Sequence, residues 1–235
     1  ASVIKSKKRS PFDYIVVDEA QDLSPAQLKF LLALGRNKSD GLFFAGDLGQ
    51  RIFQQSFSWK SLGLDMRGRS RRLNINYRTS HQIRMKADLL LGPQLADVDG
   101  NIEKRSNTIS LFNGIEPIIY RAHSTQEEVL MVSKWLEKRI SEGILPSEIG
   151  LFVRSRNEIL RAEKVAEKVK IPFLVLDEDM TPDNNNASVC LMHNVKGLEF
   201  RCVAIMGCDN HVLPLKERIE SVEETDNMDN IFNTE

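Results

Sequence analysis

The stretch YIVVDEAQDLSPAQ, residues 14–27, sets a short apolar run directly before a group of carboxylates. FDYIVV has the length and branched side chains of a buried strand, and SPAQLKFLLALGR has the apolar spacing of a helix, with Ser24 at its cap and Pro25 at its first position. In open α/β sheets, ligands bind outside the carboxyl ends of the strands. Asp18 and Glu19 therefore stand where such a fold would place a ligand.

The same alternation of strands and helices continues along the chain. The strand candidates are GLFFAGD (41–47), EPIIYRA (116–122), EIGLFVRS (148–155), IPFLVL (171–176), ASVCLMH (187–193) and RCVAIMGC (201–208). The helix candidates are STQEEVLMVSKWLEKRISEG (124–143), in which Thr125 and Glu128 form the expected capping box, and RNEILRAEKVAEKVK (156–170). The first of these helices has an apolar inner stripe made of Val129, Val132, Leu136 and Ile140. This order predicts an α/β architecture with mainly parallel sheets.

Composition excludes several classes of protein. A chain of 235 residues that is 41% hydrophobic and 28% charged suits one or two globular domains. No apolar run approaches the roughly 18 residues that cross a bilayer, and the first ten residues lack the apolar core of a signal peptide, so we expect a cytoplasmic protein without membrane association. Cys190, Cys202 and Cys208 lack metal or disulfide spacing and are expected to be reduced, buried thiols.

Charge is distributed unevenly. Residues 217–235 carry seven acids and one base, a net charge of -6, which leaves 31 bases and 26 acids before them, a net charge of +5. Basic residues gather in KSKKR (5–9) and again between Arg67 and Lys86. These clusters could contact nucleic-acid phosphates or form a solvated face, and the pattern leaves both interpretations open. The acidic end has no clear periodicity and is expected to be loose.

Other strands besides the first end in reactive groups. A single Asp-Glu pair could be no more than solvated acids before a capped helix. However, GLFFAGD also ends in an acid, Asp47, with Gln50 three residues later, and ASVCLMH ends in His193. Adjacent carboxylates can place one group toward hydrated Mg²⁺ and the other toward an attacking water, as phosphoryl transfer from a nucleotide requires.

Taken together, these segments resemble the UvrD/Rep family of superfamily-one DNA helicases. VVDEAQD is similar to the family's motif II, AGDLGQRIF to motif III, LNINYRTS to motif IV and HNVKGLEF to motif V, in the family's order. The resemblance implies RecA-like parallel-sheet motor domains of the P-loop NTPase type. It implies the end of the first motor domain in residues 1–65, a second motor domain without a large accessory insertion in 66–216, and an acidic tail in 217–235.

The resemblance also implies roles at the nucleotide. Asp18 would hold Mg²⁺ through water, and Glu19 would polarise the attacking water as general base. Gln50 would sense the γ-phosphate of ATP, and Arg78 would contact the same phosphate. Three further residues would bind the nucleotide: Tyr77 by stacking on adenine, Gly197 by allowing close backbone approach, and Glu199 by accepting from the ribose hydroxyls. A core position for Tyr77 is the alternative.

On the DNA side, the resemblance is less complete. Phe53 matches an aromatic position of the family, but the next two expected positions are Gln55 and Ser56, so Phe57 or Trp59 would have to stack on bases instead. In motif V, Leu191 replaces the Thr that usually precedes the histidine. For His193 and Lys196, DNA contact and a surface or structural role both stay open.

Two family motifs are absent: the phosphate-binding G-x-x-x-x-G-K-[ST] loop and the final arginine motif. We therefore expect an internal fragment of a longer ATP-dependent helicase that moves 3′ to 5′ on single-stranded DNA or at duplex junctions, inactive alone; a degenerate protein that lost both ends is the alternative. A non-catalytic interaction module of the same shape is a second hypothesis. A metal-dependent nuclease using Asp18, Glu19 and Asp22 is a third, but it leaves NYR and KGLEF unexplained.

Overall fold

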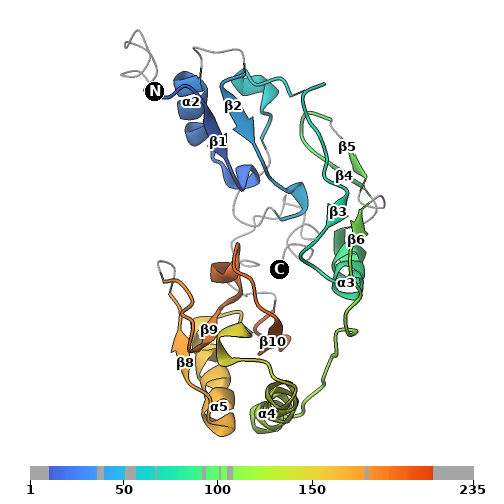
Figure 1. The fold of residues 1–235 in the computed structure, drawn as a ribbon, viewed down its shortest axis with the longest axis vertical. Helices are drawn as coiled ribbons and strands as arrows, with labels where there is room; N and C mark the ends of the chain where they lie inside the picture. The colour runs from blue at the N-terminus through green and yellow to red at the C-terminus, as the bar shows by residue number, and fades with distance from the viewer. Residues whose placement is uncertain are drawn as a thin grey trace. The chain divides into compact units, whose positions relative to one another are not determined.

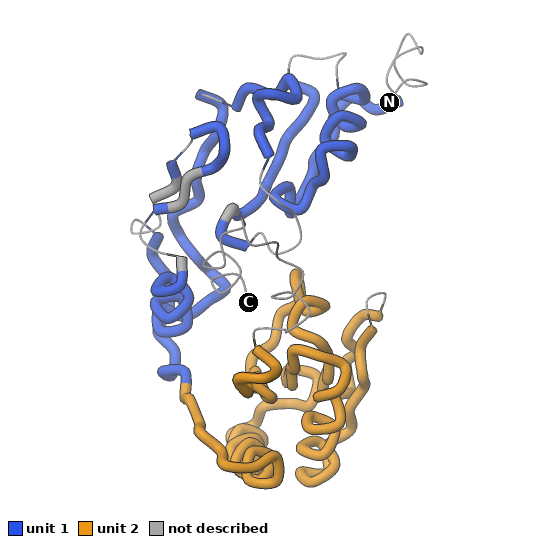
Figure 2. The backbone as a smooth tube through the Cα atoms, turned by 180° about the vertical axis from the view of Figure 1, so that it is seen from behind, with its two compact units in different colours: residues 1–117 blue, residues 118–235 orange. Residues whose placement is uncertain are grey.

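The computed structural model describes residues 11–35, 40–50, 57–66, 68–91, 94–100, 102–104, 108–177 and 180–213. Its contacts divide the chain into two compact units, unit 1 with residues 1–117 and unit 2 with residues 118–235 (Figure 2). The domain boundaries at 65/66 and 216/217 that we expect from the motifs differ from this division by contacts, and they stay predictions. The basic segment 5–9 and the acidic tail 217–235 lie outside the described residues.

Unit 1 begins with two parallel strands joined by a helix (Figure 1). β1 (Ile15–Val17) pairs with β2 (Leu42–Phe44), and α2 (Pro25–Gly35) connects them. The N–H of Gln27 donates to Ser24 Oγ at 3.3 Å, which is the cap that the sequence predicts. On the inner face of α2, Leu28 is fully buried. Both predicted strands and the predicted helix are confirmed.

The remainder of unit 1 is made of small pieces. Two 3₁₀ turns, η2 (Leu48–Gln50) and η3 (Lys60–Leu62), are followed by β3 (Ile75–Asn76), α3 (His81–Leu91) and β6 (Ile109–Ser110), and β3 and β6 pair in parallel. Between α3 and β6, β4 (Gln94–Ala96) and β5 (Ile102–Lys104) form an antiparallel hairpin. Arg84, within the predicted basic cluster, pairs with Asp88 at 2.8 Å and donates to Ser110 Oγ at 3.1 Å. Its guanidinium therefore connects α3 to β6.

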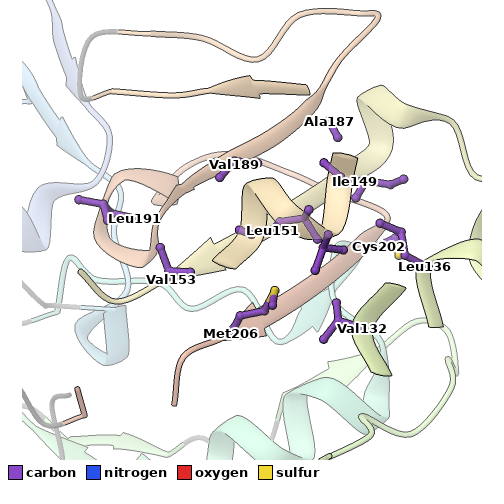
Figure 3. Close-up of a cluster of buried hydrophobic side chains, with 13 residues drawn as sticks. Val132, Leu136, Ile149, Leu151, Val153, Ala187, Val189, Leu191, Cys202 and Met206 are labelled. Carbon is purple, nitrogen blue, oxygen red and sulfur yellow. The ribbon is translucent and has the colours of Figure 1, made fainter. Parts of the chain in front are cut away.

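Unit 2 is a parallel sheet with two helices on one face. The strands β7 (Ile149–Val153), β8 (Phe173–Val175), β9 (Ala187–Leu191) and β10 (Cys202–Met206) lie in the order β10-β7-β9-β8. α4 (Thr125–Ser141) and α5 (Ile159–Val169) pack against this sheet and against each other. Figure 3 shows Val132 and Leu136 of α4 beside Cys202 and Met206 of β10. The predicted α/β class with mainly parallel sheets is confirmed.

The predicted strand at residues 116–122 is wrong, because this segment has no regular secondary structure. Its apolar side chains face solvent: Ile118 is 56% exposed and Ile119 is 86% exposed. A strand needs a neighbour to receive its backbone hydrogen bonds, and Pro117 contributes no N–H. The segment joins the two units, whose boundary falls between residues 117 and 118.

The predicted capping box of α4 is displaced by one residue. Ser124, not Thr125, is the cap, and its Oγ accepts the N–H of Glu127 at 3.2 Å. The Glu127 carboxylate accepts the N–H of His123 at 2.7 Å. Ser124 and Glu127 have the same three-residue spacing as Thr125 and Glu128, so the pattern alone fits both registers. The inner stripe of α4 packs on the sheet as expected.

The three cysteines are free thiols, and two of them are buried as predicted. Burial raises the pKa of Cys190 to about 12 and the pKa of Cys202 to about 11. The expectation is wrong for Cys208, which is exposed because it lies beyond the last residue of β10. Among the described helices, none combines the length and the apolar character needed to span a membrane.

Candidate functional site at the strand ends

The loops that follow β1 and β2 are joined to each other by backbone hydrogen bonds. The N–H of Ala45 donates to the carbonyl of Val17 at 2.8 Å, and the N–H of Ala20 donates to the carbonyl of Ala45 at 2.8 Å. These two bonds extend the parallel pairing beyond the last strand residues. The carboxylates that follow the two strands consequently meet at one edge of the sheet.

Glu19 has an unusual backbone at this edge. Its φ of 50° and ψ of 40° lie in the left-handed region, which few residues other than glycine adopt. The N–H of Glu19 donates to Asp18 Oδ1 at 2.9 Å. The side chain of Asp18 is exposed and that of Glu19 is half-buried. Strain of this kind is often found at functional sites.

The side chain of Gln21 connects the two loops by hydrogen bonds. It is 5% exposed, its Nε2 donates to the Glu19 carboxylate, and its Oε1 accepts the N–H of Asp47 at 3.0 Å. Gly46 leaves room for this amide, because a Cβ at Gly46 would lie 2.4 Å from Gln21 Oε1. Sequence reasoning gave Gln21 no role. The available signal was a polar residue next to a strand end, where a buried amide needs hydrogen-bond partners.

Asp47 connects this arrangement to Gln50. Asp47 Oδ1 accepts the N–H of Gly49 at 2.8 Å, and Oδ2 accepts from Gln50 Nε2 at 3.0 Å. A continuous chain of hydrogen bonds therefore runs from Glu19 through Gln21 and Asp47 to Gln50. Of the predicted site residues, the structure brings Asp18, Glu19 and Gln50 together.

Tyr77 and Arg78 lie elsewhere in unit 1, directly after β3. Asn76 Oδ1 accepts the N–H groups of both Arg78 and Thr79 at 2.9 Å, which fixes the turn. Tyr77 is 67% exposed, so it is not a core tyrosine, and Arg78 is exposed as well. Both side chains are accessible to a ligand.

The motif V loop of unit 2 alternates anchored and exposed residues. Leu198 and Phe200 pack into a small cluster around Phe152. The rings of Phe152 and Phe200 form a T-shaped pair with their centroids 5.3 Å apart. Between and beside them, Gly197 and Glu199 are exposed. Gly197 has a φ of 85°, and no atom lies within 4 Å of the position where its Cβ would be. The backbone at Gly197 is thus open to a ligand, and the packed side chains of Leu198 and Phe200 hold the loop in place.

The predicted DNA-binding residues are divided. Phe53 lies outside the described residues. Trp59 is half-buried in unit 1, where its ring forms a T-shaped pair with Phe44, with the ring centroids 5.2 Å apart, and a stacked pair with Phe57, with the centroids 6.4 Å apart. His193 is half-buried in unit 2, in the 3₁₀ turn η7 (Met192–Val195).

The carboxylates at the edge of β1 and β2 fit a water-mediated Mg²⁺ site better than a direct cage. Mg²⁺ usually keeps several waters and takes one or two carboxylates together with substrate phosphates. An exposed Asp18 beside Glu19 meets that requirement. In the described part of the chain, no three His, Cys, Asp or Glu residues form a group able to hold a metal.

Parallel strands with acids at their carboxyl ends, in an α/β fold, are consistent with the RecA-like motors of P-loop NTPases. Within that class, residues 1–59 match the protein-family model described as UvrD/REP helicase N-terminal domain. The expected resemblance to UvrD/Rep helicases is thereby confirmed.

Three relatives support the same conclusion. A Bacillus subtilis (strain 168) protein named "Putative ATP-dependent DNA helicase YjcD" is 26% identical over 154 residues, 63% of this chain and 20% of the relative. A component of an "ATP-dependent helicase/nuclease" of Lactococcus lactis is 23% identical over 226 residues, 82% of this chain and 18% of the relative. "Probable DNA helicase II homolog" of Mycoplasma capricolum is 26% identical over 184 residues, 74% and 24% respectively. The chain spans about a fifth of the length of these relatives.

Proposed function

We propose that the chain is part of an ATP-driven motor that moves on single-stranded DNA, and that Glu19 is its general base. The observation that carries the proposal is the hydrogen-bonded chain from Glu19 through Gln21 and Asp47 to Gln50 at the ends of β1 and β2. It connects the residue proposed to polarise water with the residue proposed to detect the γ-phosphate. The matches to helicases named as ATP-dependent support this proposal.

In this proposal, each residue has a task that its position permits. Asp18, exposed at the strand end, would hold hydrated Mg²⁺, which would offset the negative charge of the phosphates. The amide of Gln21 orients the carboxylate of Glu19 toward the water. Gln50 reports the nucleotide state to the segment that follows it. Preorganised groups of this kind lower the barrier because they do not reorganise during the reaction.

The remaining residues bind the substrates. Arg78 spreads its guanidinium over the developing charge of the γ-phosphate, and the exposed Tyr77 stacks on adenine. Gly197 admits the phosphates near its backbone, and Glu199 accepts from the ribose. Phe53, Trp59 and His193 contact DNA. A cytoplasmic location, movement from 3′ to 5′, action at duplex junctions and the boundaries at 65/66 and 216/217 belong to the same proposal.

The test is DNA-stimulated ATP hydrolysis by this chain and by a longer version extended at both ends, each with its Glu19→Gln variant. We expect turnover only in the extended protein, and a loss of at least about 100-fold in Glu19→Gln, in line with removal of a general base. Asp183→Ala, which alters an exposed loop of unit 2, is the matched control and should keep full turnover. An extended protein that binds DNA but shows no turnover would support the interaction-module hypothesis instead.

A further inference from the structure

Asp99 lies in the turn between β4 and β5 and reaches the segment that carries Trp59. Its Oδ2 accepts the N–H of Trp59 at 2.8 Å and the N–H of Lys60 at 3.0 Å, and its Oδ1 accepts from the hydroxyl of Ser58. These donors lie 39 to 41 residues before it in the chain. The contact therefore joins two segments that are distant in sequence.

The carboxylate of Asp99 accepts backbone N–H groups at the start of η3 that the side chain of Trp59 does not cap. Trp59 is the residue before this turn, and its own side chain makes no capping hydrogen bond. Ser58 completes the arrangement, because its Oγ accepts the N–H of Ser61 at 2.9 Å and its carbonyl accepts from Ser61 Oγ at 2.8 Å. The Ser58 hydroxyl and then the backbone N–H of Lys60 hold the pKa of Asp99 below its usual value. The backbone of residues 58–61 is thus fixed from two sides.

The indole ring of Trp59, which this backbone carries, packs against two other rings but is not fully buried. It forms a T-shaped pair with Phe44, the last residue of β2, and Phe57 lies nearly parallel to it with an interplanar angle of 10°. Trp59 and Phe57 are both half-buried, so part of each side chain remains accessible. Aromatic rings with an accessible face stack on unpaired bases, at a gain of about 1–3 kcal/mol per base.

We propose that Asp99 is a positioning residue, which orients Trp59 for stacking on an unpaired nucleic-acid base. The inference rests on the proposed function, and it adds a residue from the β4-β5 turn to the DNA site. A ring that is already oriented loses less conformational entropy on binding. The negative charge of Asp99 is engaged by three donors, which limits its repulsion of the DNA backbone.

The test uses the full chain with Trp135→Phe, which leaves Trp59 as the sole tryptophan of the two. Binding of an unlabelled oligothymidylate of about ten nucleotides is measured from the quenching of Trp59 fluorescence. We expect Asp99→Ala to weaken binding about tenfold and to reduce the quenching at saturation. Asp99→Asn should bind like the unmodified chain, because its amide oxygen can accept both N–H groups and its amide nitrogen can donate to Ser58 Oγ.

Asp183→Ala is the matched control. Asp183 also accepts two backbone N–H groups, from Asn185 at 2.8 Å and from Asn186 at 2.7 Å, but it lies in unit 2. Its replacement should leave both the affinity and the quenching unchanged. An equal loss in Asp183→Ala and Asp99→Ala would overturn the inference, since it would show a general effect of losing a loop carboxylate.

Two further outcomes separate the inference from the proposed function. Unchanged oligothymidylate binding in Trp59→Ala, measured by anisotropy of a labelled oligonucleotide, would contradict the DNA role of Trp59 itself. Weakened binding in Trp59→Ala together with normal binding and quenching in Asp99→Ala would contradict only the role of Asp99. If far-UV circular dichroism shows that Asp99→Ala does not fold, Ser58→Ala replaces it. That variant removes one donor to Asp99 and should weaken binding severalfold, and normal affinity would overturn the inference.

Discussion

Glu19 combines a proposed chemical role with a backbone that its residue type disfavours. Left-handed geometry costs a residue with a Cβ about 1–2 kcal/mol. Around Glu19, the hydrogen bonds from its own N–H to Asp18 and from Gln21 to its carboxylate help to hold that geometry. A disfavoured backbone that neighbouring hydrogen bonds hold in place is consistent with the proposed role of Glu19.

Replacing Glu19 separates the two effects. Asparagine tolerates the left-handed region, whereas the branched Cβ of valine opposes it. We expect Glu19→Val to unfold with a free energy about 1 kcal/mol lower than Glu19→Asn, measured by urea denaturation. Both variants should lose ATP hydrolysis in the extended protein. Equal stability of the two would show that the backbone of Glu19 is not left-handed in solution.

The buried thiol of Cys190 gives a stability that depends on pH. Its pKa is about 12 in the fold, above the ordinary value of 9.0, so below pH 9 both the folded and the unfolded chain keep the proton. Above pH 9 the unfolded chain releases it first, and stability falls by about 1.4 kcal/mol per pH unit. We expect the difference in unfolding free energy between the unmodified chain and Cys190→Ala to shrink by about 1 kcal/mol from pH 8 to pH 10. A constant difference would contradict the raised pKa.

Among the elements, Arg161 holds α4, α5 and the end of β10 together. From α5, its Nη1 pairs with Glu128 of α4 at 3.1 Å and its Nη2 with Asp209 at 2.7 Å, and its Nε pairs with Glu158. Glu128 also accepts the N–H of Gly207 at 2.8 Å. Burial alone would lower the pKa of Arg161, but hydrogen bonds to Asp209 and Glu128 outweigh it and raise the pKa. The guanidinium therefore stays charged in a largely buried position.

Removing this charge should be costly because three acids lose their partner. We expect Arg161→Met, which keeps most of the side-chain length, to lower the unfolding free energy of unit 2 by about 2 kcal/mol. Arg156→Met is the control, because Arg156 pairs with Asp177 at 2.8 Å where both side chains are more than half exposed, 68% and 59%. The control should change stability by less than about 0.5 kcal/mol in the same urea titration. Similar losses in both variants would contradict the special role of Arg161.

For the whole molecule, the segment that joins the two units is an exposed and irregular stretch of the chain. Residues 116–122 have no secondary structure, and Arg121 is exposed three residues before the cap of α4. We expect limited trypsin digestion to produce a resistant fragment that begins at Ala122, identified by N-terminal sequencing. Arg121→Ala should remove that fragment end without changing the thermal unfolding of unit 2. Equally rapid cleavage after Lys134 in α4 or Lys164 in α5 would contradict the compact unit.

The sequence predicted the long elements and missed the links between them. β7, β9 and β10 were found because each apolar run is bounded by polar residues, and α2 because its cap and its apolar spacing agree. The strand at 116–122 could not be tested from its composition, since pairing depends on a distant neighbour. The strand ends predict Asp18, Glu19 and Gln50 as site residues, and the structure links them at one edge of the sheet, while their roles stay predictions. Gln21 and Asp99 were missed because their partners lie 26 and about 40 residues away.

The rate at which Cys208 reacts with a thiol reagent reports on the ion pairs that Arg161 forms. Cys208 is the exposed thiol, and it lies between Gly207, which donates to Glu128, and Asp209, which pairs with Arg161. Partial desolvation of the sulfur, together with the nearby charges of Glu128 and Asp209, raises the pKa of Cys208 and so slows its reaction with an alkylating reagent. Any event that rearranges this corner of the sheet changes the local charge and the solvent access of the sulfur. The alkylation rate of this thiol thus reports on the packing of α4, α5 and β10 without a probe attached beforehand.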